Sequence, residues 1–162
     1  MRTLAYALAG NLLAIALATG GAFAHDSEPT TTSPTTQVNA MAKTYFDQAE
    51  GYSKKKDWNL AIAAYQQAVR IDPKFVTAWS NMGYCYRKVN QFDKAMDAYK
   101  RALTLKPDYT YPHEYLGRTY LAMGNKDAAM REYEILKRLD AKMAAGLLKA
   151  IEANNADLGD ED

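Results

Sequence analysis

Cysteine, histidine and net charge are all scarce in this sequence of 162 residues. The single cysteine, Cys85, excludes an internal disulfide framework and any zinc site built from several cysteines. The two histidines, His25 and His113, leave little for metal binding. The formal net charge is +1, whereas a dedicated nucleic-acid-binding protein carries a strongly basic face. We therefore expect no disulfide scaffold, no metal site and no nucleic-acid partner.

Motifs of catalysis are missing as well. The sequence has no glycine-rich phosphate-binding loop, no set of nucleophile, base and acid, and no paired carboxylates with a plausible cleft. Cys85 lies between two tyrosines in an apolar helical stretch, where a thiol packs as a small inert side chain. The sequence therefore predicts neither an enzyme nor a bound cofactor.

The first residues have the pattern of a secretory signal peptide. Arg2 supplies a positive charge, residues 4–18 are apolar apart from one glycine and one asparagine, and residues 22–24 form a small-x-small cleavage site. The apolar run is shorter than the roughly 20 residues that span a bilayer. We expect cleavage after Ala24, export to the periplasm or out of the cell, and no stable membrane span afterwards. An uncleaved membrane anchor is the alternative.

A linker is predicted between this signal and the folded part, over residues 25–39. The segment is rich in serine, threonine and proline, and its one large apolar residue is Val38. Such a composition cannot bury enough apolar surface to offset the entropy of ordering the chain. We expect it to be disordered.

The sequence resembles itself at an offset of 34 residues from about residue 42 onward. Pro73 and Pro107 are 34 residues apart, and counting back from each proline aligns Tyr65 with Tyr99. The matches place three repeats, at residues 42–75, 76–109 and 110–143. A period of this length is the signature of a solenoid, in which neighbouring repeats bury each other's apolar faces.

Each repeat has the pattern of two helices. In the second repeat, apolar residues recur at three- and four-residue steps over residues 79–89 and again over residues 92–103. Gly83 lies within the first stripe, where the absence of a side chain lets a neighbouring helix approach closely. Pro107 ends the second helix, because proline cannot continue a helix interior. The predicted fold is all-α.

These features resemble the tetratricopeptide-repeat family. The second repeat carries the family's residues at seven positions: Trp79, Gly83, Tyr86, Ala95, Tyr99, Ala102 and Pro107. The first and third repeats are more degenerate, as terminal repeats are. In the third, His113 replaces the packing tryptophan, which favours a structural role for this histidine. The resemblance implies a right-handed superhelical solenoid of three repeats within a domain over residues 40–154.

Helical spacing continues beyond the third repeat. Met143, Leu147 and Ile151 predict a cap helix over residues 142–154 that covers the last repeat. Residues 155–162 follow as an acidic, frayed tail. The tail carries four acidic residues, whereas residues 43–152 contain 19 basic and 13 acidic residues, a net charge of +6. This mildly basic body can attract acidic protein segments or anionic envelope surfaces.

The resemblance also implies where a partner binds. In the family, the first helix of each repeat lines a concave groove for an extended peptide or a partner's helix. The residues at these positions are Asp47, Glu50, Asn81, Tyr84, Lys88, Tyr111, Glu114, Tyr115 and Arg118. Tyrosines give a large contact area at low entropic cost, and Arg118 can grip a carboxylate in bidentate fashion. A merely solvated inner face is the alternative.

A known variant of this groove does not fit the sequence. Some family members hold the C-terminal carboxylate of cytosolic chaperones with five lysine, asparagine and arginine residues. Asn81 matches one of these positions, but the other four are Phe46, Glu50, Tyr111 and Tyr115. We expect an adaptor or scaffold in the cell envelope that binds some other protein or peptide. The alternative is a structural assembly protein, a homo-oligomer in which the repeats of different copies stack.

Overall fold

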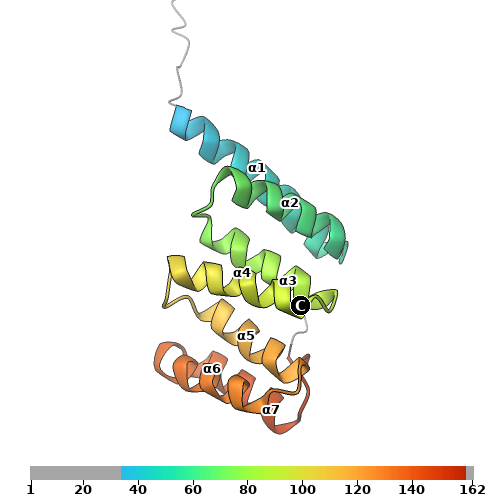
Figure 1. Ribbon diagram of the computed structural model, residues 1–162, viewed down its shortest axis with the longest axis vertical. Helices are drawn as coiled ribbons and strands as arrows, with labels where there is room; N and C mark the ends of the chain where they lie inside the picture. The colour runs from blue at the N-terminus through green and yellow to red at the C-terminus, as the bar shows by residue number, and fades with distance from the viewer. Residues whose placement is uncertain (1–33, 160–162) are drawn as a thin grey trace, which may run out of the picture. The chain divides into compact units, whose positions relative to one another are not determined.

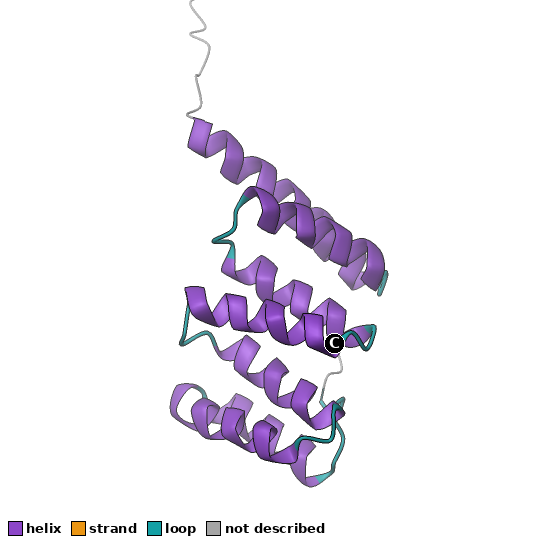
Figure 2. Cartoon of the chain, viewed as in Figure 1, coloured by secondary structure: helices purple, strands orange, loops and turns teal. Residues whose placement is uncertain are grey.

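The computed structural model describes residues 34–159, so the predicted signal peptide lies outside the described part. These residues form seven α-helices and no strands (Figures 1 and 2). The helices are α1 (Pro34–Lys54), α2 (Trp58–Ile71), α3 (Val76–Lys88), α4 (Phe92–Leu105), α5 (Thr110–Ala122), α6 (Lys126–Leu139) and α7 (Ala141–Glu152). None of them is both long and apolar enough to cross a membrane.

The helices pack as consecutive pairs that follow one another in chain order. α1 packs on α2, α3 on α4 and α5 on α6, while α2 meets α3 and α4 meets α5 (Figure 1). α7 closes the stack, because it packs against both α6 and α5. The predicted all-α stack of three helix pairs with a cap helix is confirmed.

The same turn ends α1, α3, α5 and α7. The second residue after each helix has a positive φ: Lys56 (62°), Asn90 (59°), Gly124 (75°) and Asn154 (51°). After α3, the amides of Asn90 and Gln91 donate to the carbonyls of Arg87 and Tyr86, the pattern of a Schellman motif. Three of these positive-φ residues are 34 positions apart, so the repeat is visible in the backbone as well as in the sequence.

Two glycines allow a neighbouring helix to approach closely. A β-carbon added at Gly83 would lie 2.5 Å from Cε1 of Tyr99, and one at Gly117 would lie 2.5 Å from Cδ2 of Leu147. Tyr99 and Leu147 are fully buried. The predicted close approach at Gly83 is confirmed, and Gly117 gives the cap helix a matching contact on α5.

Two predicted boundaries differ from the structure. α1 begins at Pro34, so residues 34–39, which were predicted to be linker, are helical. Proline is favoured in a first helical turn, and extending a helix from an already packed segment costs much less than starting one. The cap helix spans Ala141–Glu152 because Asp140 accepts hydrogen bonds at its start from the amides of Lys142 and Met143, both 3.0 Å.

Candidate functional site

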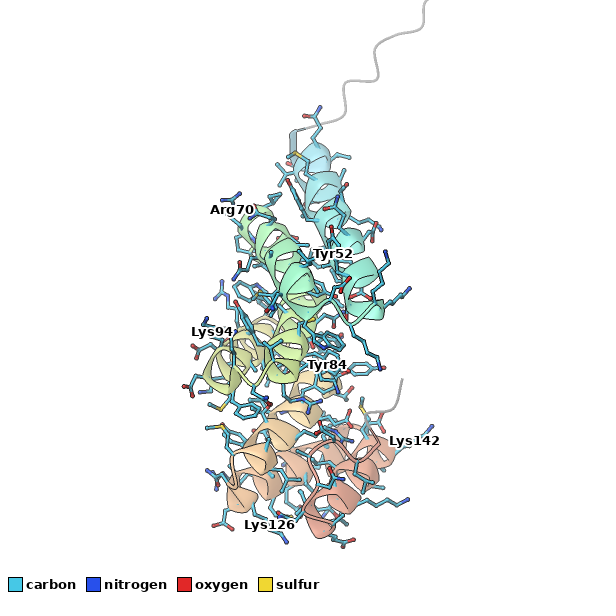
Figure 3. All side chains as sticks on the ribbon, turned by 90° about the vertical axis from the view of Figure 1, so that its right-hand side faces the viewer. Tyr52, Arg70, Tyr84, Lys94, Lys126 and Lys142 are labelled. Atoms are coloured by element: carbon cyan, nitrogen blue, oxygen red, sulfur yellow. The ribbon has the colours of Figure 1, made fainter. Side chains whose placement is uncertain are left out.

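All nine predicted site residues lie on α1, α3 and α5. These helices, together with α7, form what we call the odd-helix face. Figure 3 places Tyr84 and Lys142 on this side of the stack, and Arg70 and Lys94, from α2 and α4, on the opposite side. The family pattern therefore selected helices that share one face.

Aromatic rings form a continuous row across this face. The ring of Tyr84 lies 5.8 Å from that of Trp58 and 5.3 Å from that of Tyr115. Tyr111 continues the row, at 6.1 Å from Tyr115 and 5.8 Å from Tyr109. These separations are those of favourable aromatic pairs. Tyr84 and Tyr115 are half-buried, whereas Tyr111 is 47% exposed. We call these five residues the aromatic row.

Two cations lie against the centre of the aromatic row. Nζ of Lys88 is 5.4 Å and Cζ of Arg87 is 5.6 Å from the centre of the Tyr84 ring, within cation–π range. Burial, and then the nearby Glu114 carboxylate, raise the pKa of the Tyr115 hydroxyl above its ordinary value. Tyr115 therefore stays neutral at physiological pH and keeps a proton to donate.

Glu50 and Asn81 link the first two repeats. Nδ2 of Asn81 donates a hydrogen bond to Oε1 of Glu50 over 2.7 Å, and the Tyr65 hydroxyl donates to the same oxygen. Asn81, one of the predicted groove residues, therefore already uses one of its amide protons in the hydrogen bond to Glu50. Asp47 lies apart from this network and pairs with Lys43 over 2.6 Å on the exposed surface, where ion pairs contribute little.

Arg118 is buried rather than open to a ligand. Its side chain is 2% exposed, and its Nε and Nη2 atoms donate to Oε1 of Glu114 over 3.1 and 2.9 Å. Its Nη1 atom donates to the carbonyls of Ala156 and Leu158, over 3.1 and 2.8 Å. The Arg118 guanidinium, which was predicted to bind a partner's carboxylate, is therefore already bound to Glu114 and to the C-terminal segment, residues 155–159.

The C-terminal segment is also held by α3. Nη1 of Arg87 donates to Oδ1 of Asp157 over 3.0 Å, with the arginine side chain 3% and the aspartate 72% exposed. The prediction of a frayed tail is wrong for residues 155–159. Their carbonyls and carboxylate accept hydrogen bonds from two buried guanidinium groups, and charged groups are costly to bury without such partners.

Two pockets border the C-terminal segment. One, of about 350 Å³, is lined by Lys56, Trp58, Arg87, Lys88, Asn90, Phe92, Ala122 and Asp157. The other, of about 670 Å³, is lined by Thr110, Tyr111, Glu114, Arg118, Asp140, Lys142, Met143, Gly146, Lys149, Leu158 and Gly159. Each pocket thus combines members of the aromatic row or their cationic neighbours with residues of the segment.

Comparison with known families agrees with this geometry. Residues 76–109 match the tetratricopeptide repeat family, and residues 51–89 match a second family of TPR repeats. The chain is a tetratricopeptide-repeat protein. No curated protein sequence matches it significantly.

Solved structures share the fold of this tetratricopeptide-repeat protein at low identity. The first TPR of Spaghetti (RPAP3) bound to the HSP90 peptide SRMEEVD has a TM-score of 0.67 and 21% identity, and covers 71% of this chain and 93% of that chain. The Arabidopsis OM64 TPR domain has a TM-score of 0.68 and 14% identity, and the match covers 72% of this chain and 98% of that chain. The first TPR domain of human RPAP3 has a TM-score of 0.67 and 21% identity, and the match covers 76% of this chain and 99% of that chain.

The family pattern missed three parts of this face. Trp58 begins α2, a second helix of its repeat, whereas the pattern assigned first helices alone to the groove. Arg87 stands where the neighbouring repeats have Ser53 and Leu121, so the 34-residue alignment singles it out as an unusual charge. The C-terminal segment was signalled only by its negative charge opposite a basic body, because no local pattern joins positions so far apart in the chain.

Reactive side chains in the described part of this tetratricopeptide-repeat protein serve packing. Cys85 is fully buried, 3.9 Å from the Ser53 hydroxyl, and burial raises the pKa of its thiol to about 12, which leaves almost no reactive thiolate. His113 is buried between Glu132 and the Pro107 carbonyl. Within residues 34–159, no three histidine, cysteine, aspartate or glutamate side chains gather to hold a metal ion. His25 lies outside the described residues.

Proposed function

We propose that this tetratricopeptide-repeat protein is an adaptor or scaffold that holds a segment of another protein on its odd-helix face. The aromatic row carries the proposal. It offers connected rings, exposed at Tyr111, with Lys88 and Arg87 beside Tyr84. Half-buried tyrosines are pre-ordered by their neighbours, so they provide contact area and hydroxyl groups at little entropic cost on binding.

A peptide segment is the partner class that the fold supports best. One structural neighbour is bound to the peptide SRMEEVD. The present chain has aromatic or acidic side chains where a carboxylate clamp needs cations and an asparagine, at Phe46, Glu50, Tyr111 and Tyr115. We therefore expect its partner's segment to rest on rings, with its side chains in the flanking pockets, rather than to be gripped by a terminal carboxylate.

We place this adaptor outside the cytoplasm, in the cell envelope. Support comes from the sequence of residues 1–24, which has the charge, apolar run and small-residue site of a signal peptide. N-terminal sequencing of the exported protein should begin at His25. A mature protein that retains residues 1–24 would refute cleavage.

The role of the odd-helix face can be tested by comparing two double variants. Lys88→Ala with Tyr111→Ala removes a cation and the most exposed ring of the aromatic row. Arg70→Ala with Lys126→Ala is the matched control, because it changes even-numbered helices and leaves the row intact. We expect the first variant to lower the affinity for a partner captured from an envelope extract by at least about tenfold, as loss of interface anchors does, and the control to bind as the parent chain does. Equal affinity of both variants for the partner would exclude the odd-helix face as the partner-binding surface. Light scattering over a concentration series tests self-assembly, which a strict monomer would rule out.

A further inference from the structure

The C-terminal segment turns back onto the odd-helix face through local interactions. Asn154 takes a positive φ of 51° after α7, and the amide of Asn155 donates to the carbonyl of Ala150. The Asn155 side chain then accepts from the amide of Asp157 over 3.0 Å. Asparagine is well suited to both roles, a left-handed cap and a side-chain turn. Residues 154–159 therefore form an ordered turn that leads back to the odd-helix face.

The contacts of this segment are those expected of a bound peptide. It presents two main-chain carbonyls to Arg118 of α5 and one carboxylate to Arg87 of α3. Both arginines come from first helices of neighbouring repeats, and Arg87 also lies against the aromatic row at Tyr84. An extended partner segment that crosses from the third repeat to the second would meet the same donors.

The basic side chains around the segment favour an acidic segment over a neutral one at this place. The pocket beside Asp157 is lined by three cations, Lys56, Arg87 and Lys88, and Asp157 is the one acidic residue in its lining. The sequence adds three more acidic residues after Gly159, at positions 160–162. Through Asp157, the described part of the segment brings negative charge to this basic pocket beside the aromatic row.

The segment is held by polar contacts more than by apolar burial. Leu158 is 41% exposed, and Asp157 is largely in solvent. Segments with few buried apolar contacts open at low free energy, without unfolding of the rest of the protein. The segment can therefore leave its arginines while α7 stays in place.

We propose that the C-terminal segment, residues 155–159, acts as an intramolecular competitor for the odd-helix face. The inference rests on the proposed function of that face, and it adds regulation. In the closed state the segment covers Arg87 and Arg118, and a partner reaches these two arginines only when the segment has left. The apparent association constant for the partner is then the intrinsic constant multiplied by the fraction of molecules in which the segment has left the arginines.

The test uses the chain's own segment as the probe. A labelled synthetic peptide with the sequence of residues 154–162, NNADLGDED, is titrated into the full chain and into a chain truncated after Asn154. A short linker gives an effective concentration in the millimolar range, so the titration extends to about 5 mM peptide. We expect saturable binding to the truncated chain, at least about tenfold weaker binding to the full chain, and no binding of a scrambled peptide of equal charge.

Two further variants make the result specific. Arg87→Ala in the truncated chain should weaken peptide binding at least about fivefold, because it removes the partner of Asp157. Asp157→Asn in the full chain should increase binding of the added peptide and speed hydrogen exchange at the amides of residues 157–159, with α7 unchanged. This variant keeps α7 and its cap, so it remains informative if truncation disturbs folding.

The outcomes separate this proposal from the function on which it rests. Equal peptide binding by the full and truncated chains, or none by the truncated chain up to the highest concentration, overturns the competitor. If the peptide binds the truncated chain more tightly than the full chain, but partner capture is unaffected by the Lys88 and Tyr111 substitutions, the competitor is upheld and the proposed function is refuted. If partner capture depends on Lys88 and Tyr111 but is unchanged by truncation after Asn154, the proposed function is upheld and the competitor is refuted.

Discussion

The glycine at position 83 decides how closely α3 and α4 pack. An added methyl group there would lie 2.5 Å from the Tyr99 ring, which is fully buried. Overpacking of this kind costs about 1–3 kcal/mol, against about 1 kcal/mol gained from the better helix propensity of alanine. We expect Gly83→Ala to lower the free energy of unfolding by up to about 2 kcal/mol in urea titrations followed by circular dichroism.

Gly51→Ala is the matched control for that change. Gly51 also lies inside a helix, but nothing approaches within 4 Å of its added β-carbon. The helix-propensity gain is then unopposed, so stability should rise by up to about 1 kcal/mol. If both variants shifted stability in the same direction, the close approach at Gly83 would not be what keeps the residue small.

The buried ring of His113 lies between two hydrogen-bond acceptors, which makes the stability of the fold depend on pH. Nδ1 of His113 lies 2.8 Å from Oε2 of Glu132 and Nε2 lies 3.0 Å from the Pro107 carbonyl. Both partners are acceptors, and only the protonated ring can donate to both. Burial lowers the pKa of His113, but the hydrogen bonds to Glu132 and to the Pro107 carbonyl outweigh it, so the pKa lies above its ordinary value.

The sign of the pH effect follows from that raised pKa. A group that binds its proton more tightly in the folded state stabilises the fold fully below the unfolded pKa, which is about 6.5 for histidine. The contribution is lost as the pH rises through the folded pKa. The free energy of unfolding should therefore fall above about pH 6.5 in the parent chain, and less steeply in His113→Gln. An identical slope in the variant would assign the pH dependence to other groups.

At the scale of the element, the turns after α1 and α5 make opposite predictions. Lys56 and Gly124 occupy the same position of the repeat, both with positive φ. A residue with a β-carbon pays about 1 kcal/mol in this conformation. Lys56→Gly should therefore raise the free energy of unfolding by about 0.5–1 kcal/mol, and Gly124→Ala should lower it by about 1 kcal/mol.

The neighbouring lysine provides the control for this pair. Lys55 has no positive φ, so Lys55→Gly adds only the entropy of a more flexible unfolded chain and should lower stability. Thermal and urea unfolding of the three variants test the sign of each effect. A gain in stability from Lys55→Gly would show that the left-handed position is not what distinguishes Lys56.

Most of the elements could be predicted from the sequence because their signals are local. The 34-residue period and the apolar stripes give six helices and the cap, each within a single repeat length. The start of α1 could not be predicted in this way, because residues 34–39 have no apolar stripe. They are helical through continuation of a helix that is packed from Ala42 onward.

At the scale of the whole molecule, the site was predictable only as far as family geometry fixes helix faces. Geometry placed Tyr84, Tyr111 and Tyr115 on one face, and the structure joins them in one row. The burial of Arg118 could not be foreseen, since it depends on carbonyls about 40 residues away. The Arg87–Asp157 pair spans 70 positions and exists only once the stack has formed.

The cap helix gives the last prediction, because the buried apolar side chains form two separate clusters. One joins α1 to α4 and reaches Leu116, whereas the other joins the end of α5 to α6 and α7. Leu147 and Ile151 of α7 are almost fully buried in the second cluster. Each large apolar side chain contributes about 1.5–3 kcal/mol, so truncation after Asp140 should remove about 3–6 kcal/mol from this cluster.

A stack of repeats loses stability locally, because each repeat contacts only its neighbours. Truncation after Asp140 should therefore abolish hydrogen-exchange protection in α5 and α6 while the amides of α2 and α3 keep theirs. Truncation after Asn154 leaves α7 in place and should preserve protection in α6. Retained protection of α6 without α7 would mean that the third repeat needs no cap. Loss of protection in all helices at once would mean that the two clusters fold as one cooperative unit despite their separation.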